Sequence, residues 1–124
     1  MYRRNALLAL LLLVSLPAYS HHSQAAYDLK NTVELVGTVK SFEWTNPHSW
    51  IVLEVTSEQG DTAEWSVEMG NPRQLFRAGW RPGTLKPGDQ IKLTINPTKN
   101  GSRGGQFFAA EYVNGDLIET AGDE

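Results

Sequence analysis

The sequence predicts a small all-β domain of five strands, with one short helix between the third and the fourth strand. Two observations carry this prediction. Short segments in which apolar and polar residues alternate recur along the chain, and this is the pattern of half-buried strands. Gly, Pro and Asn residues, which favour turns, separate those segments. With 124 residues, the chain has room for one domain.

The first strand is expected to begin at Thr32 and to bend. The alternating residues first occupy odd-numbered positions, Val33, Leu35, Gly37 and Val39, and then the even-numbered positions Phe42 and Trp44. A change of parity inside one strand indicates a bulge or a bend, here between Gly37 and Ser41.

Two further strands are expected before the helix. The second strand follows the Asn46-Pro47 turn, covers His48 to Val55, and is apolar on both faces. The third strand covers Thr62 to Met69 and alternates regularly, which predicts one buried face. Its inward side chains are expected to be Ala63, Trp65, Val67 and Met69. Glu64 and Glu68 fall on the other parity and are expected to face solvent.

A short helix is expected to begin at Asn71-Pro72, because Asn caps helices and Pro suits the first helical position. Leu75 and Phe76 are expected to face inward. Gly79 is expected to end the helix.

The last two strands follow a loop with two Pro-Gly pairs. The fourth strand is expected to end before Pro97, and the pairs Asn100-Gly101 and Gly104-Gly105 are expected to form a mobile turn. The alternating apolar positions of the two strands are Ile91, Leu93 and Ile95, and then Phe108, Ala110 and Tyr112.

The order of three strands, a helix and two strands fits the OB fold, a five-stranded Greek-key barrel. A bent first strand fits that barrel as well. We therefore predict an OB-like barrel over residues 32–119, with residues 120–124 as a C-terminal tail.

The first twenty residues have the pattern of a secretory signal peptide. Arg3 and Arg4 precede an almost unbroken apolar run from Ala6 to Leu16, and small residues surround the expected cut after Ser20. A membrane anchor would need about 20 apolar residues, and this run is shorter. We expect residues 1–20 to be removed and the protein to be periplasmic, with no stable membrane insertion. An alternative cut falls after Ala25.

The chain that remains begins with a polar segment, residues 21–31, which is expected to be a loose N-terminal arm. Cleavage removes two arginines and no acidic residue, so the mature chain carries nine Lys and Arg residues against 14 Asp and Glu, a formal charge of −5. This balance argues against a nucleic-acid partner, because such binding depends on clustered cations. The sequence has no cysteine, which excludes disulfides and any site built on a thiolate.

Five segments form a set that is characteristic in combination. They are His21-His22-Ser23, Gly37-Thr38-Val39, Trp44-Thr45-Asn46-Pro47-His48-Ser49-Trp50, Ala78-Gly79-Trp80 and Leu85-Lys86-Pro87-Gly88-Asp89. Over essentially the whole chain, they resemble the bacterial exported family known as domain of unknown function 6152. The resemblance implies an exported β-barrel. It brings no established activity, so no catalytic residue is transferred from it.

The histidines are the leading candidates for chemistry, and there are three: His21, His22 and His48. A cut after Ser20 makes His21 the N-terminal residue, whose amine and Nδ1 can chelate one Cu(II) ion. His48 would complete the arrangement called a histidine brace. Amine and imidazole nitrogens suit copper and lose their protons close to neutral pH. The sequence therefore predicts a Cu(II) site, with His22 as an extra or alternative ligand and zinc as the next metal.

Other interpretations stay open at this stage. The histidines of the terminus can be simply solvated, with His48 an ordinary residue at the start of a strand. A Cu(I) site of His48, Met69 and either Trp44 or Trp50 is another, because the small periplasmic copper chaperone of metal-efflux systems is an OB barrel with methionine, histidine and tryptophan ligands. Core packing is the expected role of Met69.

A different class of function uses the aromatic residues. Trp44 and Trp50 flank the turn at residues 46–47 and could form an exposed platform for a periplasmic glycan or protein ligand, with packing in the core or at its rim as the alternative. The sequence contains none of the motifs that mark hydrolases, metalloproteases or phosphate-binding loops. We therefore predict a non-enzymatic binding protein.

Overall fold

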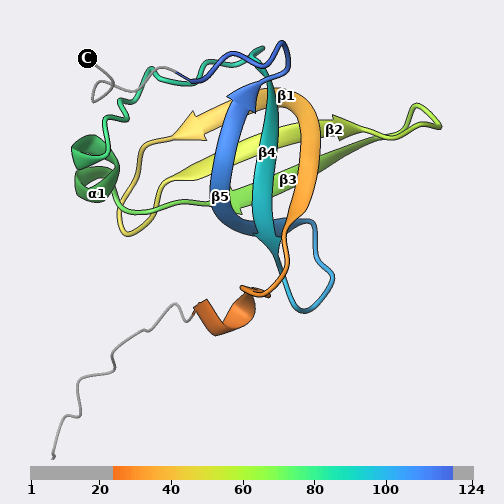
Figure 1. Ribbon diagram of the computed structural model, residues 1–124, viewed down its shortest axis with the longest axis horizontal. Helices are drawn as coiled ribbons and strands as arrows, with labels where there is room; N and C mark the ends of the chain where they lie inside the picture. The colour runs from red at the N-terminus through yellow and green to blue at the C-terminus, as the bar shows by residue number, and fades with distance from the viewer. Residues whose placement is uncertain (1–23, 119–124) are drawn as a thin grey trace, which may run out of the picture.

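The computed structural model of the protein describes residues 24–118 (Figure 1). The expected signal peptide, His21, His22 and the expected C-terminal tail lie outside the described residues. The elements follow one another as a 3₁₀ helix η1 (Gln24–Ala26), β1 (Val33–Glu43), β2 (Trp50–Thr56), β3 (Thr62–Glu68), α1 (Pro72–Arg77), β4 (Gln90–Pro97) and β5 (Gly104–Tyr112).

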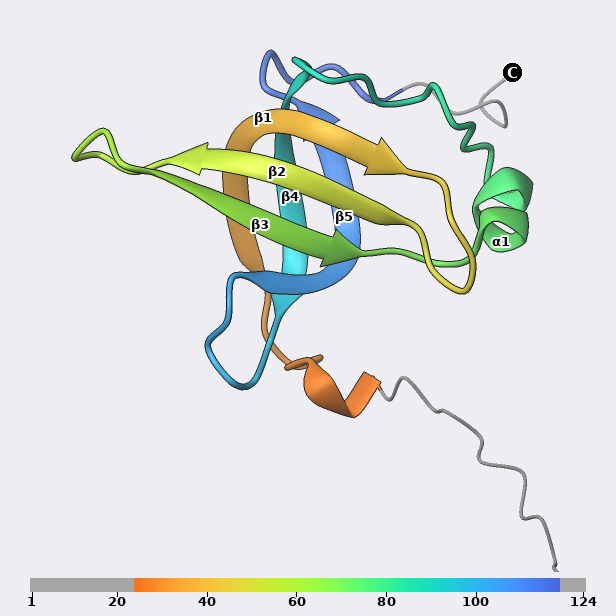
Figure 2. The same cartoon turned by 180° about the vertical axis from the view of Figure 1, so that it is seen from behind.

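The five strands form a closed barrel in the order β1-β2-β3-β5-β4. All neighbouring strands are antiparallel except β3 and β5, which run parallel where they close the barrel. The helix α1 connects β3 to β4 and lies at the end of the barrel opposite the β2–β3 turn (Figures 1 and 2). This confirms the predicted five-stranded OB-like barrel. Within residues 24–118, no helix has the length and apolar character needed to cross a lipid bilayer.

The bend predicted in the first strand is present in β1. Residues 33–38 pair with β4 and residues 38–43 pair with β2, so one strand serves both halves of the barrel. The pairing register shifts between Val39 and Ser41. Gly37 lies at the start of this change, and a Cβ atom there would overlap the carbonyl oxygen of Glu54. The position therefore needs a glycine because the backbone of β2 passes too close for a side chain.

Aliphatic side chains fill the barrel interior. Those with no exposed surface are Ile51, Leu53, Val67, Ile91, Leu93 and Ile95. They occupy alternate positions of β2, β3 and β4, as the period-two pattern predicts. Each such side chain contributes about 1.5–3 kcal/mol when it leaves water. Met69 and Trp65 pack in or against the same core, as expected.

The fifth strand differs from its prediction because it contains a bulge. Phe108 belongs to the alternating apolar positions of the predicted strand, but it is 63% exposed, and Phe107 packs against the core instead. Thr94 pairs with Ala109 and Ile95 pairs with Phe107, which leaves Phe108 as an extra residue between them. One extra residue reverses the alternation, so simple period-two reasoning fails beyond it.

The glycine pair at residues 104–105 belongs to β5 and not to the turn in which it was expected. Both glycines are buried and pair with Ser66 and Val67 of β3, so they close the barrel. The fourth strand also runs through Pro97, one position further than predicted. Proline is tolerated at this last position, because its carbonyl oxygen still accepts a hydrogen bond from the Asp28 N–H at 2.8 Å.

The helix begins and ends as predicted, but only one of its two expected core residues is buried. Asn71 and Gln74 form a capping box, and Gly79 follows the helix with a φ of 91°. Leu75 is 8% exposed, whereas Phe76 is 56% exposed. Neighbouring residues of a helix point about 100° apart, so a single turn that buries Leu75 turns Phe76 outward. The guanidinium of Arg81 lies 3.7 Å above the Phe76 ring.

Candidate functional site

A cavity of about 270 Å³ opens beside the C-terminal end of β3. Its walls come from the N-terminal arm, the loop before β2, the end of β3 and the start of β5. The lining side chains include Gln24, Tyr27, His48, Glu68, Gln106 and Phe107. Segments that are far apart in the sequence therefore meet at this cavity, and it contains the one predicted metal ligand that falls within residues 24–118.

The loop at residues 44–49 holds His48 against the end of β3. The Ser49 N–H donates to the Gly70 carbonyl at 3.0 Å, and the Met69 N–H donates to the Ser49 carbonyl at 2.8 Å. The Thr45 hydroxyl donates to the carbonyl oxygen of His48 at 2.8 Å. Ser49 is completely buried. The backbone on both sides of His48 is thus fixed, which leaves its ring little freedom to leave the cavity.

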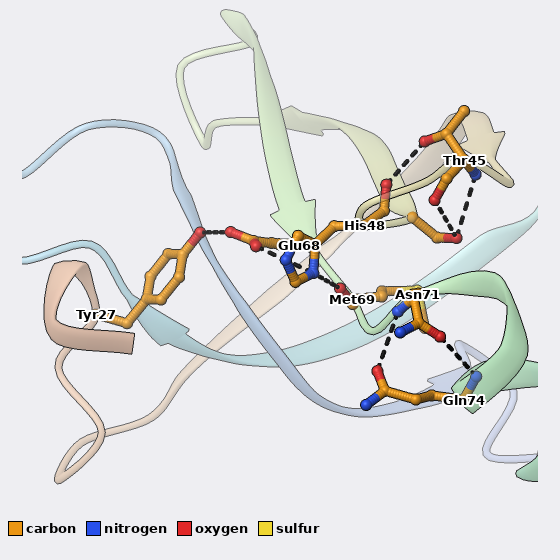
Figure 3. Close-up of polar contacts among 8 residues, drawn as sticks. Tyr27, Thr45, His48, Glu68, Met69, Asn71 and Gln74 are labelled. Carbon is orange, nitrogen blue, oxygen red and sulfur yellow. Dashed lines mark hydrogen bonds and ion pairs between the residues drawn. The ribbon is translucent and has the colours of Figure 1, made fainter. Parts of the chain in front are cut away.

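The ring of His48 is oriented through its Nδ1 atom (Figure 3). Nδ1 lies 3.0 Å from the Met69 carbonyl oxygen and 3.3 Å from Oε1 of Glu68. A carbonyl oxygen can only accept, so Nδ1 carries the proton in this hydrogen bond. In the neutral imidazole, Nε2 then holds the lone pair. This is the arrangement of metal-binding histidines, which donate their other N–H to a carbonyl or a carboxylate.

Glu68 also binds the N-terminal arm. The hydroxyl of Tyr27 donates to Oε2 of Glu68, while Oε1 faces His48 (Figure 3). Burial raises the pKa of the Tyr27 hydroxyl, and the hydrogen bond to Glu68 and its negative charge raise this pKa further. Tyr27 therefore stays protonated and remains a donor. The Glu68 side chain is 12% exposed, and both of its oxygens face polar groups.

The N-terminal arm is attached to the barrel over residues 24–31, which corrects the prediction that it is loose. The Asp28 N–H donates to the Pro97 carbonyl at 2.8 Å, and the Lys99 N–H donates to the Ala26 carbonyl at 2.9 Å. The side-chain amide of Asn96 donates to the carbonyl oxygen of Asn31 at 2.9 Å. The polar composition of the arm suggested mobility, but its backbone groups find partners at the end of β4.

The structure separates the two tryptophans that were expected to form one platform. Trp44 packs against the hydrophobic core and makes an edge contact with Phe42 at 6.0 Å. Trp50 pairs with Glu43 and Glu68 of the neighbouring strands, on the face of β2 opposite to the buried Ile51. Trp44 therefore lies on the core side of the barrel, whereas Trp50 lies on the face of β2 opposite to Ile51.

The predicted metal ligands are only partly placed. His48 lies in the cavity, whereas His21 and His22 lie outside the described residues. Residues 24–118 contain no cluster of three or more metal-ligating side chains. Met69 is 4% exposed within the core, so packing is its role, as expected. Its contact with His48 is made by the backbone carbonyl.

Sequence reasoning missed Tyr27 and misplaced Glu68. The strand pattern put Glu64 and Glu68 on the solvent face, and Glu64 is indeed exposed, with Lys40 at 2.6 Å. Glu68 has the same parity but lies at the end of β3, where the arm covers it. Tyr27 is separated from Glu68 by 41 positions, so no local pattern could connect them.

Three solved structures show similarity to this chain. The mitochondrial single-stranded DNA-binding protein Rim1 of S. cerevisiae is 12% identical, with a TM-score of 0.49 over 67% of this chain and 94% of that chain. The N-terminal domain of PriB from Thermoanaerobacter tencongensis is 18% identical, with a TM-score of 0.47 over 68% of this chain and 97% of that chain. The small single-stranded DNA-binding protein of Streptomyces coelicolor is 16% identical, with a TM-score of 0.43 over 66% of this chain and 90% of that chain.

No curated protein shows significant sequence similarity to the chain. The sequence profile described as the Family of unknown function (DUF6152) matches residues 9–108, which is most of the chain and includes every strand up to the middle of β5. The resemblance seen in the sequence segments is confirmed, and the chain belongs to this family.

Proposed function

We propose that the protein is an exported, non-enzymatic barrel that binds Cu(II) at the mouth of the cavity. The ligands are the terminal amine and Nδ1 of His21, together with Nε2 of His48. The observation that carries the proposal is the position of Gln24. This residue follows His21 by three positions and lines the same cavity as His48 and Glu68.

The length of the chain supports this assignment. An extended chain spans about 3.3–3.6 Å per residue, so the Cα atoms of His21 and Gln24 are separated by at most about 11 Å. The Asp28 N–H donates to the Pro97 carbonyl of β4, and Gln24, three positions after His21, lines the cavity. A ligand pair from the terminus can therefore meet His48 without displacing any strand of the barrel.

The ligand set favours copper. Residues 24–118 contain no group of three or more metal-ligating side chains and supply His48 to the proposed site, so its other donors come from outside this range. An amine and two imidazoles form a nitrogen-rich set, and Cu(II) has the highest affinity in the divalent series for such ligands. His22 is an alternative donor from the same terminus, and zinc is the competing metal.

Replacing His48 tests the proposal directly. The protein is produced so that it begins at His21, its first residue is verified by mass spectrometry, and Cu(II) and Zn(II) are titrated by calorimetry. We expect His48→Ala to weaken Cu(II) binding by more than the roughly 10–100-fold that the loss of an outer partner causes.

A surface variant outside the cavity, Lys86→Ala, is the matched control and should bind Cu(II) as the parent protein does. Circular dichroism verifies that both variants fold. Equal Cu(II) affinity in the parent protein and His48→Ala would contradict the brace and would leave only a terminal complex of His21 and His22.

We also propose that the protein has no nucleic-acid partner. OB folds bind oligonucleotides across the face of strands 2 and 3. Here, Glu54 of β2 pairs directly with Glu64 of β3 on that face, and both are exposed. Lys40 pairs with Glu64, but the remaining negative charge of the two carboxylates repels phosphate, and the mature chain expected after cleavage is acidic as a whole.

We therefore expect no binding of a fluorescently labelled oligothymidine at protein concentrations up to about 100 µM, where non-specific binders are already bound. Fluorescence anisotropy at low salt measures this. Micromolar binding that weakens as salt is added would contradict the prediction, and the effect of Glu64→Lys would then show whether the β2–β3 face is responsible.

A further inference from the structure

We infer that Glu68 is a positioning residue that joins the N-terminal arm to the ring of His48 and, together with the Met69 carbonyl oxygen, favours the tautomer in which Nε2 of His48 is presented to a metal. The effect of Glu68 on metal affinity rests on the proposed function, because it requires that His48 binds Cu(II). As a link between the arm and the ring, it stands on the described contacts alone.

The two oxygens of the Glu68 carboxylate have different partners. Oε2 accepts a hydrogen bond from the Tyr27 hydroxyl, and Oε1 lies 3.3 Å from Nδ1 of His48 (Figure 3). The Glu68 side chain is only 12% exposed, so its oxygens meet these protein groups in place of much of their water. Tyr27 and His48 therefore interact with opposite oxygens of the same carboxylate, and Glu68 orients both side chains.

The arm side of this link has its own anchor. The backbone of residues 26–28 is bonded to the end of β4 and the following loop, and Tyr27 pairs with Thr98. The Tyr27 side chain extends from this anchor to the end of β3, where its hydroxyl donates a hydrogen bond to Glu68. The approach of the mature N-terminus to the cavity thus depends on the same carboxylate that orients His48.

The chemistry of an amide distinguishes this role from simple packing. Glutamine has the size of glutamate but one accepting oxygen and one donating nitrogen in place of two accepting oxygens. In Glu68→Gln, the amide N–H₂ must face either the Tyr27 hydroxyl or Nδ1 of His48. If it faces Nδ1, it opposes the hydrogen bond that Nδ1–H donates to the Met69 carbonyl oxygen and favours the tautomer with the proton on Nε2, which removes the lone pair that a metal would bind.

The first measurement uses the metal-free protein beginning at His21. Nitrogen-15 NMR at about pH 8, above the ordinary imidazole pKa of about 6.5, reports the tautomer of His48. We expect the Nδ1–H form in the parent protein and a shift toward the Nε2–H form in Glu68→Gln. Tyr27→Phe should keep the Nδ1–H form but speed the hydrogen exchange of the Asp28 and Lys99 amides, because the arm loses its side-chain anchor.

The second measurement is the affinity for Cu(II). We expect Glu68→Gln to weaken it by about 10–100-fold, the usual effect of losing an outer-shell partner of a ligating histidine. Tyr27→Phe should weaken it by a smaller factor. Glu64→Gln makes the same chemical change on the same strand, where the carboxylate faces Lys40 at the surface, and should leave both readouts unchanged.

The outcomes separate the two claims. If the parent protein binds no Cu(II), the proposed function fails, while the tautomer and the exchange rates still test the link. If the His48 tautomer is unchanged in Glu68→Gln and the exchange rates are unchanged in Tyr27→Phe, the inference is overturned. If Glu68→Gln does not fold, the exchange rates of Tyr27→Phe decide by themselves.

Discussion

One residue added in front of His21 should weaken Cu(II) binding by at least about 100-fold, beyond the range caused by losing an outer-shell partner. The physical reason is that the amine of His21 becomes an amide, which is no longer a basic nitrogen at neutral pH. Two of the three nitrogens proposed for the site depend on that amine, because it forms the chelate ring with Nδ1 of the same residue. The measurement is competitive Cu(II) titration of the two proteins.

The design of this experiment has to account for His22. An added residue would move His22 to the third position, where the terminal amine, two backbone amides and an imidazole can bind Cu(II) by themselves. Both proteins are therefore made in a His22→Ala background. Electron paramagnetic resonance counts the nitrogen ligands in each complex. If the extended protein retains the same affinity and the same number of nitrogen ligands, the brace is ruled out.

The second large effect is expected from Gly105→Ala, which should destabilise the barrel by about 3 kcal/mol or more, at the upper end of the range for overpacking. A Cβ atom at this position would lie 2.6 Å from the carbonyl oxygen of Asn96 and 2.7 Å from Cδ1 of Ile95. The carbonyl belongs to β4, which pairs with β5 at this point, so neither strand can move without breaking the ladder. For a domain of this size, each kcal/mol lowers the Tm by about 4–8 °C.

Urea and thermal unfolding of the mature chain measure this change. Gly83→Ala is the matched control, because a Cβ at Gly83 meets no atom within 4 Å. That variant should be neutral or slightly stabilising, since alanine reduces the freedom of the unfolded chain. Equal stability of Gly105→Ala and Gly83→Ala would show that β4 and β5 do not close as tightly as the structure has them.

Most of the fold could be predicted from local patterns. The alternation in residues 62–69 placed Val67 and Met69 in the core, and both are buried. The capping residue Asn71 and the terminating Gly79 delimited the helix. These features succeed because each depends on neighbours within a few positions of the chain, where strand and helix periods are fixed by backbone geometry.

Predictions from local patterns failed where a strand pairs with a segment that is distant in the sequence. The bulge at Phe108 reverses the parity of β5, because β4 has one residue fewer on the opposite side. Gly104 and Gly105 have the composition of a turn, but they form the strand that closes the barrel against β3. In each case, pairing with the neighbouring strand determined the conformation. A single sequence does not show which strands will be neighbours.

The candidate site divides in the same way. From the sequence, His48 could be identified as the histidine of the folded domain, and a terminal His21 could be expected from a cut after Ser20. The fold was needed to show that Tyr27, Glu68 and His48 line one cavity and that Nδ1 of His48 faces the Met69 carbonyl oxygen. The reason is that the pairing of β2 with β3 brings His48 to Met69, 21 positions away, and the attachment of the arm to the end of β4 brings Tyr27 to Glu68, 41 positions away. No local pattern encodes either pairing.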